Sequence, residues 1–284
     1  MIDCYSPAVT DLAVVTEPSC APGRSLVLSL FPGADLFGRG FELEGYCVVR
    51  GPDVLWGADV RDFVGVPGRF DGVIGGPPCQ DFSGLNRSPG GYGREMLAEY
   101  LRVVSECQPD WFVMENVARV PDVVLSGYTV QRFDLNANEC GLAQSRLRHF
   151  QFGSRRGCVV TLQRGVRSGV SQSICLASEG DRSERRSFAD FCELQGLPRD
   201  FDLPGLSVAA SYRAVGNGVP VPMARVVARA VTVQAVPGPG SSLCVCGCGR
   251  LVTGRRELAL GACRQRVSRA RRNVTNRGVV SIGV

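Results

Sequence analysis

The sequence predicts an α/β protein built on a doubly wound, parallel sheet. Between Ser25 and Gly153, short apolar runs alternate with turn residues, and runs this short are typical of strands buried on both faces. Between two of them, Arg94 to Cys107 carries apolar residues at i, i+3 and i+4 spacing, which predicts a helix with one apolar face. Such alternation favours a doubly wound domain whose ligands bind at the carboxyl ends of the strands.

Six segments form the predicted strands of this sheet. In chain order they are residues 26–30, 46–50, 72–75, 111–115, 128–133 and 149–152. The helix at 94–107 joins the third strand to the fourth, and a closing helix is predicted over 222–233.

Composition changes divide the chain further. Residues 1–23 form a leader, 24–153 the main α/β domain, and 154–209 a region that begins rich in Gly, Ser and Arg. Residues 210–236 complete the α/β domain. A Pro/Gly/Ser-rich linker over 237–243 precedes a basic, cysteine-rich module over 244–284.

Charge is distributed unevenly along the 284 residues. All 32 basic residues are arginine, and the net charge is +5. Residues 244–284 hold nine arginines and one acid, a net charge of +8, whereas the other 23 arginines and 26 acids give −3. A basic tail on a nearly neutral body indicates a polyanion such as nucleic acid, although a solvated arm has the same composition.

The sequence also bears on location and assembly. No apolar run reaches the roughly 18 residues that a membrane span needs, and the N-terminus has no basic start or apolar core typical of a secretory signal. We expect a cytoplasmic monomer from a bacterium or a phage-infected cell.

Three motifs carry the chemistry. The segment from Gly75 to Gln80 holds Cys79 on a rigid Pro-Pro turn directly after a predicted strand, where α/β enzymes keep reactive groups. The next strand ends in Glu115, so a carboxyl group is expected at the neighbouring strand tip. Arg146 and Arg148 precede another strand and offer two guanidinium forks, unless they are ordinary surface charges.

These motifs resemble those of the DNA cytosine-5 methyltransferases, in the same order, across most of residues 25–230. The matching segments are Phe31-Pro32-Gly33, Gly75 to Gln80, Glu115-Asn116-Val117, Gln144 to Arg148, Leu194 to Pro198 and Gly216 to Val219. The resemblance implies a Rossmann-like fold for S-adenosylmethionine-dependent methyl transfer, double-stranded DNA as substrate, and the methyltransferase of a restriction-modification system. With about thirty residues, Ser154 to Arg186, the target-recognition insertion is reduced.

The resemblance also implies roles for individual residues. Cys79 would attack carbon 6 of a flipped cytosine, while protonated Glu115 holds ring nitrogen 3. Arg146 and Arg148 would complete the catalytic set. The residues assigned to substrate binding are Gln80, Ser83, Arg87 and Gln144.

The implied cofactor is S-adenosylmethionine. The residues assigned to it are Phe31, Gly33, Asp53, Asp59, Pro78, Asn217 and Val219. For Asp53 and Asp59, capping of a loop is the alternative. The chain departs from the family pattern at Ser29, where an aspartate is usual, and at Asp35-Leu36, where two glycines are usual.

The tail has a cysteine pattern of its own. Cys244, Cys246, Cys248 and Cys263 offer four thiolates, which is the ligand number of a structural zinc site. The Cys-x-Cys-x-Cys spacing is tighter than a usual knuckle, so free thiols are the alternative.

Two other functions fit the same motifs. One is an RNA cytosine-5 methyltransferase, since a subgroup of the family acts on transfer RNA. The other is a DNA-binding relative without catalysis, against which the presence of Cys79, Glu115, Arg146 and Arg148 argues.

Overall fold

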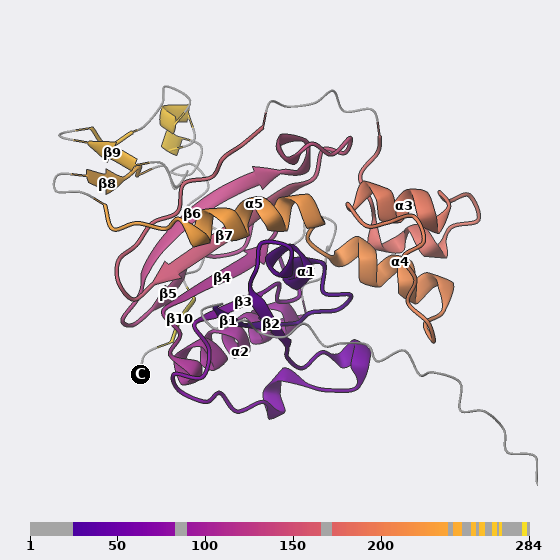
Figure 1. Ribbon diagram of the computed structural model, residues 1–284, viewed down its shortest axis with the longest axis horizontal. Coiled ribbons are helices and arrows are strands. Elements are labelled where there is room, and N and C mark those ends of the chain that lie inside the picture. The colour runs from indigo at the N-terminus through magenta and orange to yellow at the C-terminus, as the bar shows by residue number, and fades with distance from the viewer. Residues whose placement is uncertain are drawn as a thin grey trace, which may run out of the picture.

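A six-stranded mixed sheet forms the centre of the molecule, with strand order β2-β1-β3-β4-β7-β6 (Figure 1). Its strands are β1 (Leu26–Leu30), β2 (Cys47–Arg50), β3 (Gly72–Gly75), β4 (Trp111–Asn116), β6 (Thr129–Asn136) and β7 (Leu147–Ser154). The computed structural model describes residues 25–82, 90–165 and 172–237, and the shorter segments 241–245, 251–253, 256–258, 263–265, 267–268 and 280–282.

The expected parallel pairing holds for four strands and fails for two. β2, β1, β3 and β4 run parallel, whereas β7 is antiparallel to both β4 and β6. β7 follows β6 after only ten residues, which include the short 3₁₀ helix η3 (Ala137–Cys140). A parallel pair needs a crossover of a dozen or more residues, so this connection selects antiparallel pairing.

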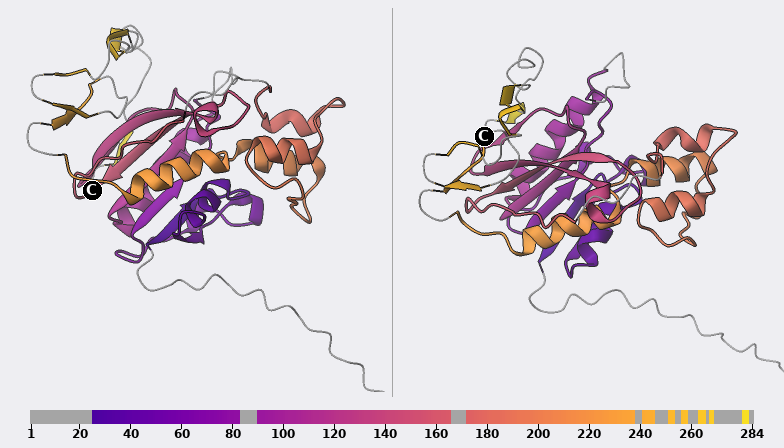
Figure 2. Two further views of the ribbon diagram at one scale, coloured as in Figure 1. Left: turned by 45° about the horizontal axis from the view of Figure 1, so that its top comes forward. Right: turned by 90° about the horizontal axis from the view of Figure 1, so that it is seen from above.

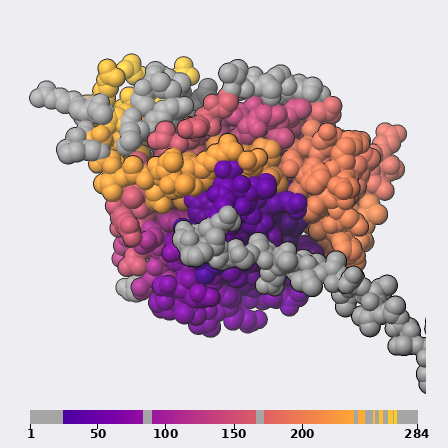
Figure 3. Space-filling view, in the orientation of Figure 1, coloured from indigo at the N-terminus to yellow at the C-terminus, as the bar shows by residue number. Residues whose placement is uncertain are grey.

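Helices cover both faces of the sheet, which makes the fold doubly wound (Figure 2). α1 (Leu36–Glu42) and α5 (Val221–Thr232) pack together on one face, and α5 runs along the body in Figure 3. α2 (Tyr92–Cys107) covers the other face. Successive strand residues belong to opposite cores: Val113 packs with α5, while Phe112 and Met114 pack with α2. Alternate residues of a central strand therefore contribute to two separate hydrophobic cores.

α1 and α5 approach closely because α1 carries a glycine at their contact. A Cβ atom on Gly40 would lie 2.3 Å from the Cβ of Ala224, so a larger residue at this position would force the helices apart. This packing matters for the site because α1 begins directly after the loop that follows β1.

A smaller lobe stands at one end of the sheet (Figure 1). It contains η4 (Ala177–Asp181), α3 (Phe188–Leu194) and α4 (Val208–Asn217). α3 and α4 share a core that includes Phe191, Tyr212 and Val215, and η4 packs on α4. Leu36 of α1 belongs to the same core, so the lobe is packed onto the main domain. Between β2 and β3 lie the 3₁₀ helices η1 (Val54–Trp56) and η2 (Val60–Asp62).

The C-terminal part adds strands outside the main sheet. β8 (Ser241–Leu243) and β9 (Leu251–Thr253) form an antiparallel pair. β10 (Val280–Ile282) pairs in parallel with β5 (Val123–Leu125) of the main domain. Residues 244–284 were expected to form a separate module, yet their last described strand returns to the body.

Two further expectations concern the N-terminal leader and the absence of a membrane span. The predicted leader, residues 1–23, lies outside the described residues. Among the helices that the structure does describe, none combines the length and apolarity needed to cross a bilayer.

Candidate active site

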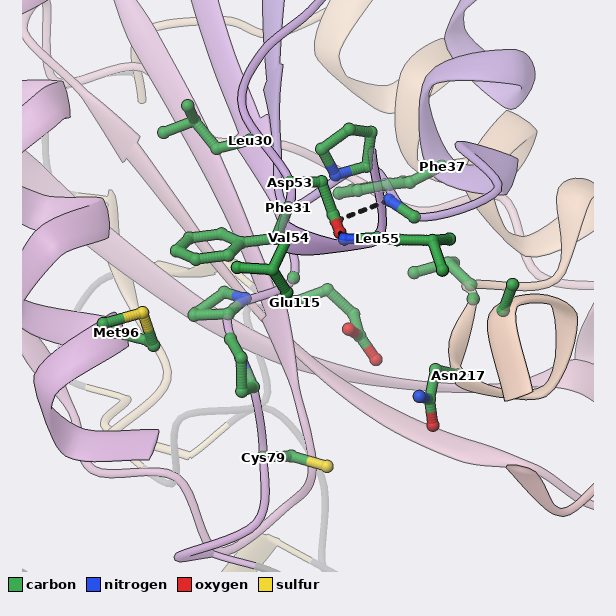
Figure 4. A pocket seen from close by; sticks show the side chains of 18 of the residues that line it. Leu30, Phe31, Phe37, Asp53, Val54, Leu55, Cys79, Met96, Glu115 and Asn217 are labelled. Carbon is green, nitrogen blue, oxygen red and sulfur yellow. Dashed lines mark hydrogen bonds between the residues drawn. The ribbon is translucent and has the colours of Figure 1, made fainter. Parts of the chain in front are cut away.

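A cavity of about 440 Å³ opens at the carboxyl ends of β1, β3 and β4, and α4 closes one side of it (Figure 4). This volume lies in the range typical of small-molecule and cofactor sites. Figure 4 shows the side chains of Cys79, Glu115 and Asn217 directed into the same space.

The turn that carries Cys79 is fixed by the neighbouring strand. The Asn116 side-chain amide at the end of β4 donates a hydrogen bond of 2.9 Å to the Pro77 carbonyl. Gly76 leaves room for the acid, because a Cβ atom there would lie 2.9 Å from Glu115 Oε2. The turn and the strand tip thus hold the thiol and the carboxyl group on one wall of the cavity.

Glu115 is almost fully buried and pairs with Arg148, whose Nε lies 2.9 Å from Glu115 Oε1. Burial raises the pKa of Glu115, although Arg148 and then Arg146 oppose the shift. Burial also raises the pKa of Cys79, and the nearby Glu115 carboxylate adds to that increase. Both groups are therefore biased toward their protonated forms before a ligand enters.

The loop after β1 forms the opposite wall. Phe31 has φ 53°, a left-handed backbone that is unusual for an aromatic residue, and its side chain lines the cavity. Asp53 accepts hydrogen bonds of 2.8 Å from the Gly33 N–H and from the Leu55 N–H. The Trp56 indole donates to the Gly33 carbonyl at 2.8 Å. Gly33 is thus held through both of its backbone polar groups.

All seven residues expected to bind a cofactor line this cavity. For Asp53 and Asp59 the capping alternative also applies, because each carboxylate caps a 3₁₀ helix. Asp59 pairs with Arg61 as well, and hydrogen bonds from Arg61 lower the pKa of Asp59 to about 2. Gln80 lines the cavity too, whereas Ser83 and Arg87 lie outside the described residues.

Arg146, which was expected to complete the catalytic set, does not line the cavity. Arg146 is buried and donates to the backbone carbonyls of Cys175, Gly216 and, at 3.3 Å, Gly218. Burial lowers the pKa of Arg146 to about 9. Its guanidinium therefore ties the start of β7 to the turn after α4 and does not line the cavity.

Gln144, which was expected to bind substrate, also points into the interior. Its side chain is fully buried, donates to Leu194 O and Gln195 Oε1, and accepts from the Cys175 N–H. Gln195, also fully buried, donates to Val215 O at 2.7 Å. No hydrogen-bonding group of Gln144 is left for substrate, and the pair instead supports the turn that carries Asn217.

The two departures from the family pattern meet in space. Ser29 Oγ donates to Asp35 Oδ1 at 2.8 Å in a buried position, and Asp35 also caps α1 through the Gly38 N–H. Arg50 Nε lies 2.9 Å from Asp35 Oδ2. A carboxylate from the start of α1 therefore reaches the end of β1, where the resemblance leads us to expect an aspartate on the strand itself.

The tail cysteines are only partly described. Cys244 and Cys263 are buried in one small cluster with Val252, while Cys246 and Cys248 lie outside the described residues. Within the part of the chain that the structure describes, no three His, Cys, Asp or Glu side chains gather as a metal site.

Comparison with known proteins gives consistent matches. The model of a family described as C-5 cytosine-specific DNA methylase matches residues 58–173 and 170–232. Type II methyltransferase M.HgiDI of Herpetosiphon aurantiacus is 37% identical over 101 residues, which cover 32% of this chain and 33% of that protein. M.XorII of Xanthomonas oryzae pv. oryzae is 29% identical over 232 residues, 66% of this chain and 53% of that protein.

The matched regions thus span a third to about half of these two relatives. Among solved structures, the Entamoeba histolytica methyltransferase EhMeth superposes with a TM-score of 0.53 at 10% identity, over 72% of this chain and 96% of that chain. At this identity the likeness concerns the fold alone.

Proposed function

Because the chain belongs to the C-5 cytosine-specific DNA methylase family, we propose that it transfers a methyl group to carbon 5 of cytosine in double-stranded DNA. One observation carries the proposal: Cys79, Glu115 and Arg148 share one cavity with Phe31, Asp53 and Asp59. A nucleophile and a buried acid thus face the same space as an aromatic ring and two carboxylates.

The chemistry begins at Cys79. Its thiolate adds to carbon 6 of the cytosine, while the protonated Glu115 carboxyl donates to ring nitrogen 3 and neutralises the charge that develops there. Carbon 5 then has enamine character and takes the methyl group. Loss of the carbon 5 proton to a base and expulsion of the Cys79 thiolate restore the aromatic ring.

The raised pKa of Glu115 suits this role, because a carboxyl group must carry its proton to donate it. Arg148, whose Nε lies 2.9 Å from Glu115 Oε1, keeps the carboxyl group in place from the side. When the acid is neutral, its charge no longer raises the pKa of Cys79, so protonation of Glu115 favours formation of the thiolate.

S-adenosylmethionine, when bound, supplies the electrophilic methyl group. The residues in the cavity suit it: Phe31 offers a ring face for the adenine, and Asp53 and Asp59 offer carboxylate oxygens for ribose hydroxyls and an amine. Gly33 lets the backbone approach the ligand, and Asn217 and Val219 close the side formed by the turn after α4.

The target base must leave the duplex to reach Cys79, which lies on a concave wall. Gln80, which is exposed beside the thiol, is positioned to contact the flipped nucleotide. Ser83 and Arg87, which follow Gln80 in the sequence, are proposed as further contacts to the DNA.

The test traps the covalent adduct. A duplex pool that carries 5-fluorocytosine, incubated with the cofactor, should give a stable adduct that peptide mapping assigns to Cys79, because fluorine blocks the loss from carbon 5. Cys79→Ser should give no adduct and no methyl transfer, since a hydroxyl has far too high a pKa to supply the anion. An adduct on another cysteine would overturn the mechanism.

Methyl transfer from labelled cofactor to DNA and to transfer RNA distinguishes the proposed function from the two alternatives. Labelled methyl groups should enter duplex DNA and not transfer RNA. Transfer to RNA alone would identify the RNA enzyme, and DNA binding without transfer would identify the silent relative.

Zinc remains a proposal for the tail. The burial of both Cys244 and Cys263 in one cluster supports it. Elemental analysis of the purified protein should find about one zinc per chain, as four thiolates would bind. Absence of zinc, with thiols that react freely with a chromogenic disulfide, would indicate free thiols.

A further inference from the structure

Arg213 lies at the mouth of the cavity and has no role in the chemistry described above. It belongs to α4, on the face that also presents Ala210, Ala214 and Asn217 to the cavity. Its side chain is 58% exposed. A cavity-lining residue that remains this accessible stands at the rim and not on the floor.

The guanidinium of Arg213 is held only loosely. Its nearest described carboxylate is Asp181 of η4, at 3.6 Å, and that side chain is half exposed as well. Ion pairs between exposed side chains contribute little to stability, so Arg213 can leave Asp181 with only a small loss of free energy. Arg148, the other cation among the described residues that line the cavity, is committed to Glu115 at 2.9 Å.

The charges of the cavity are therefore divided. The carboxylates of Asp53 and Asp59 lie after β2, where they cap η1 and η2, whereas Arg213 lies on the α4 side of the cavity. An anionic group that approaches the mouth is repelled from the first side and attracted to the second. This polarity selects where a nucleotide can place its phosphates.

We propose that Arg213 binds a backbone phosphate of the DNA strand that carries the target cytosine. The inference rests on the proposed function and extends it to a residue of the substrate-binding rim. A base that reaches Cys79 on the cavity wall leaves its sugar and two flanking phosphates at the mouth, within the region that a long arginine side chain can reach. Asp181 competes with the phosphate for the same guanidinium.

The experiment measures the affinity for a short duplex whose central cytosine faces an abasic site, because an unpaired base flips at low cost. Each lost phosphate contact lowers the slope of log K against log salt by about 0.9. The deficit of Arg213→Ala relative to wild type should therefore shrink about threefold between 50 and 200 mM salt. Arg213→Lys should keep the wild-type slope, and Asp181→Asn should bind roughly twofold more tightly.

Arg69→Ala is the matched control. Arg69 is exposed in the turn before β3, at the end of that strand away from the cavity, so its loss should leave the slope unchanged. Affinity for S-adenosylmethionine, measured by calorimetry, should stay at the wild-type value in Arg213→Ala.

Each result decides the inference. A wild-type slope in Arg213→Ala, or an equal change in Arg69→Ala, overturns it while the proposed function stands. Lost cofactor affinity with an unchanged slope would assign Arg213 to the cofactor carboxylate and overturn it too. A wild-type protein that binds no duplex at 50 mM salt would remove both this inference and the proposed function.

Discussion

The protonation states of Cys79 and Glu115 are linked through their shared burial. Burial raises the pKa of each group, and the charge of Glu115 raises that of Cys79 further. Arg148 opposes both shifts. The acid and the nucleophile therefore cannot be treated as independent groups, and a change in one alters the reactivity of the other.

Glu115→Gln tests this coupling. Removing the carboxylate charge should lower the pKa of Cys79, so alkylation of Cys79 by iodoacetamide, followed by peptide mapping, should reach its midpoint at lower pH. Methyl transfer should fall about a hundredfold or more, because an amide stabilises the developing charge poorly, while DNA affinity changes much less. Turnover within a few-fold of wild type would show that Glu115 has another role.

Asp35 gives a pH dependence of stability. Burial raises its pKa from 3.8 to about 6, against the lowering effects of Ser29 and Arg50. The folded state thus binds this proton more tightly than the unfolded state, and the free energy of unfolding falls as pH rises from about 4 to about 6. A shift of about two units corresponds to about 3 kcal/mol.

Asp35→Asn should remove that decline, since an amide does not titrate. Urea unfolding at several pH values should show that the wild type loses more stability than Asp35→Asn as pH rises from about 4 to about 6. Above pH 6 the free energies of unfolding of the two proteins should change with pH in parallel. Ser29→Ala, which keeps the carboxylate, is the control and should retain the decline. Parallel pH curves for wild type and Asp35→Asn would contradict the assignment.

The sequence predicts only some of the side chains that face the cavity. Cys79 and Glu115 share the cavity because the parallel strands β3 and β4 end at one edge of the sheet, and Arg148 joins them because the antiparallel strand β7 begins there. Arg146 and Gln144 turn inward instead. Their partners come from carbonyl groups about 30 to 70 residues away, which no local pattern encodes.

At the scale of elements, strands with continuous apolar runs were predictable within one or two residues for β1, β3 and β4. β5 was missed because three residues are too short to show a period, and β10 because its partner is distant in the chain. The direction of β7 depends on the length of the connection from β6, which the apolar pattern does not report. The apolar pattern likewise does not predict the side-chain hydrogen bonds that hold the end of α4.

Gln195→Ala tests the support of the turn after α4. Gln195 donates to Val215 O and accepts from Gln144, both in the interior. Its removal should cost two buried hydrogen bonds and lower the free energy of unfolding by about 1–3 kcal/mol. Since Asn217 and Val219 line the cavity, affinity for S-adenosylmethionine should fall as well.

Calorimetry with the cofactor and urea unfolding measure the two effects on Gln195→Ala. Gln234→Ala, beyond the end of α5, serves as the control and should change neither quantity. Loss of stability without any loss of cofactor affinity would show that the turn keeps its shape without Gln195.

At the scale of the whole molecule, the cavity and the first described strands of the C-terminal part lie far apart. α4 borders the cavity, while β8 and β9 stand at the other end of the sheet in both Figures 1 and 2. The chain reaches them along α5, after which Ala235 bridges Val159, near the end of β7. A DNA contact made by β8 and β9 would thus be remote from the cavity.

Truncation after Pro239 tests whether residues 244–284 hold DNA. The three cores of the main domain and the lobe draw only on residues before this point, so the shortened chain should fold, with a modest loss from the missing β10 pairing on β5. Nine arginines lie in the removed part. Duplex affinity should therefore fall, and each lost phosphate contact should reduce the salt slope by about 0.9.

Because β8 and β9 lie away from the cavity, the truncation should lower DNA affinity more than it lowers turnover. At saturating DNA, turnover should stay near the wild-type value, because the residues around Cys79 are untouched. If the choice of methylated sequence also degrades, the module reads bases; if only affinity falls, it acts as an electrostatic anchor. Unchanged affinity and slope would instead make the module a solvated arm, and the DNA would then be held by the rim of the cavity, where Arg213 stands.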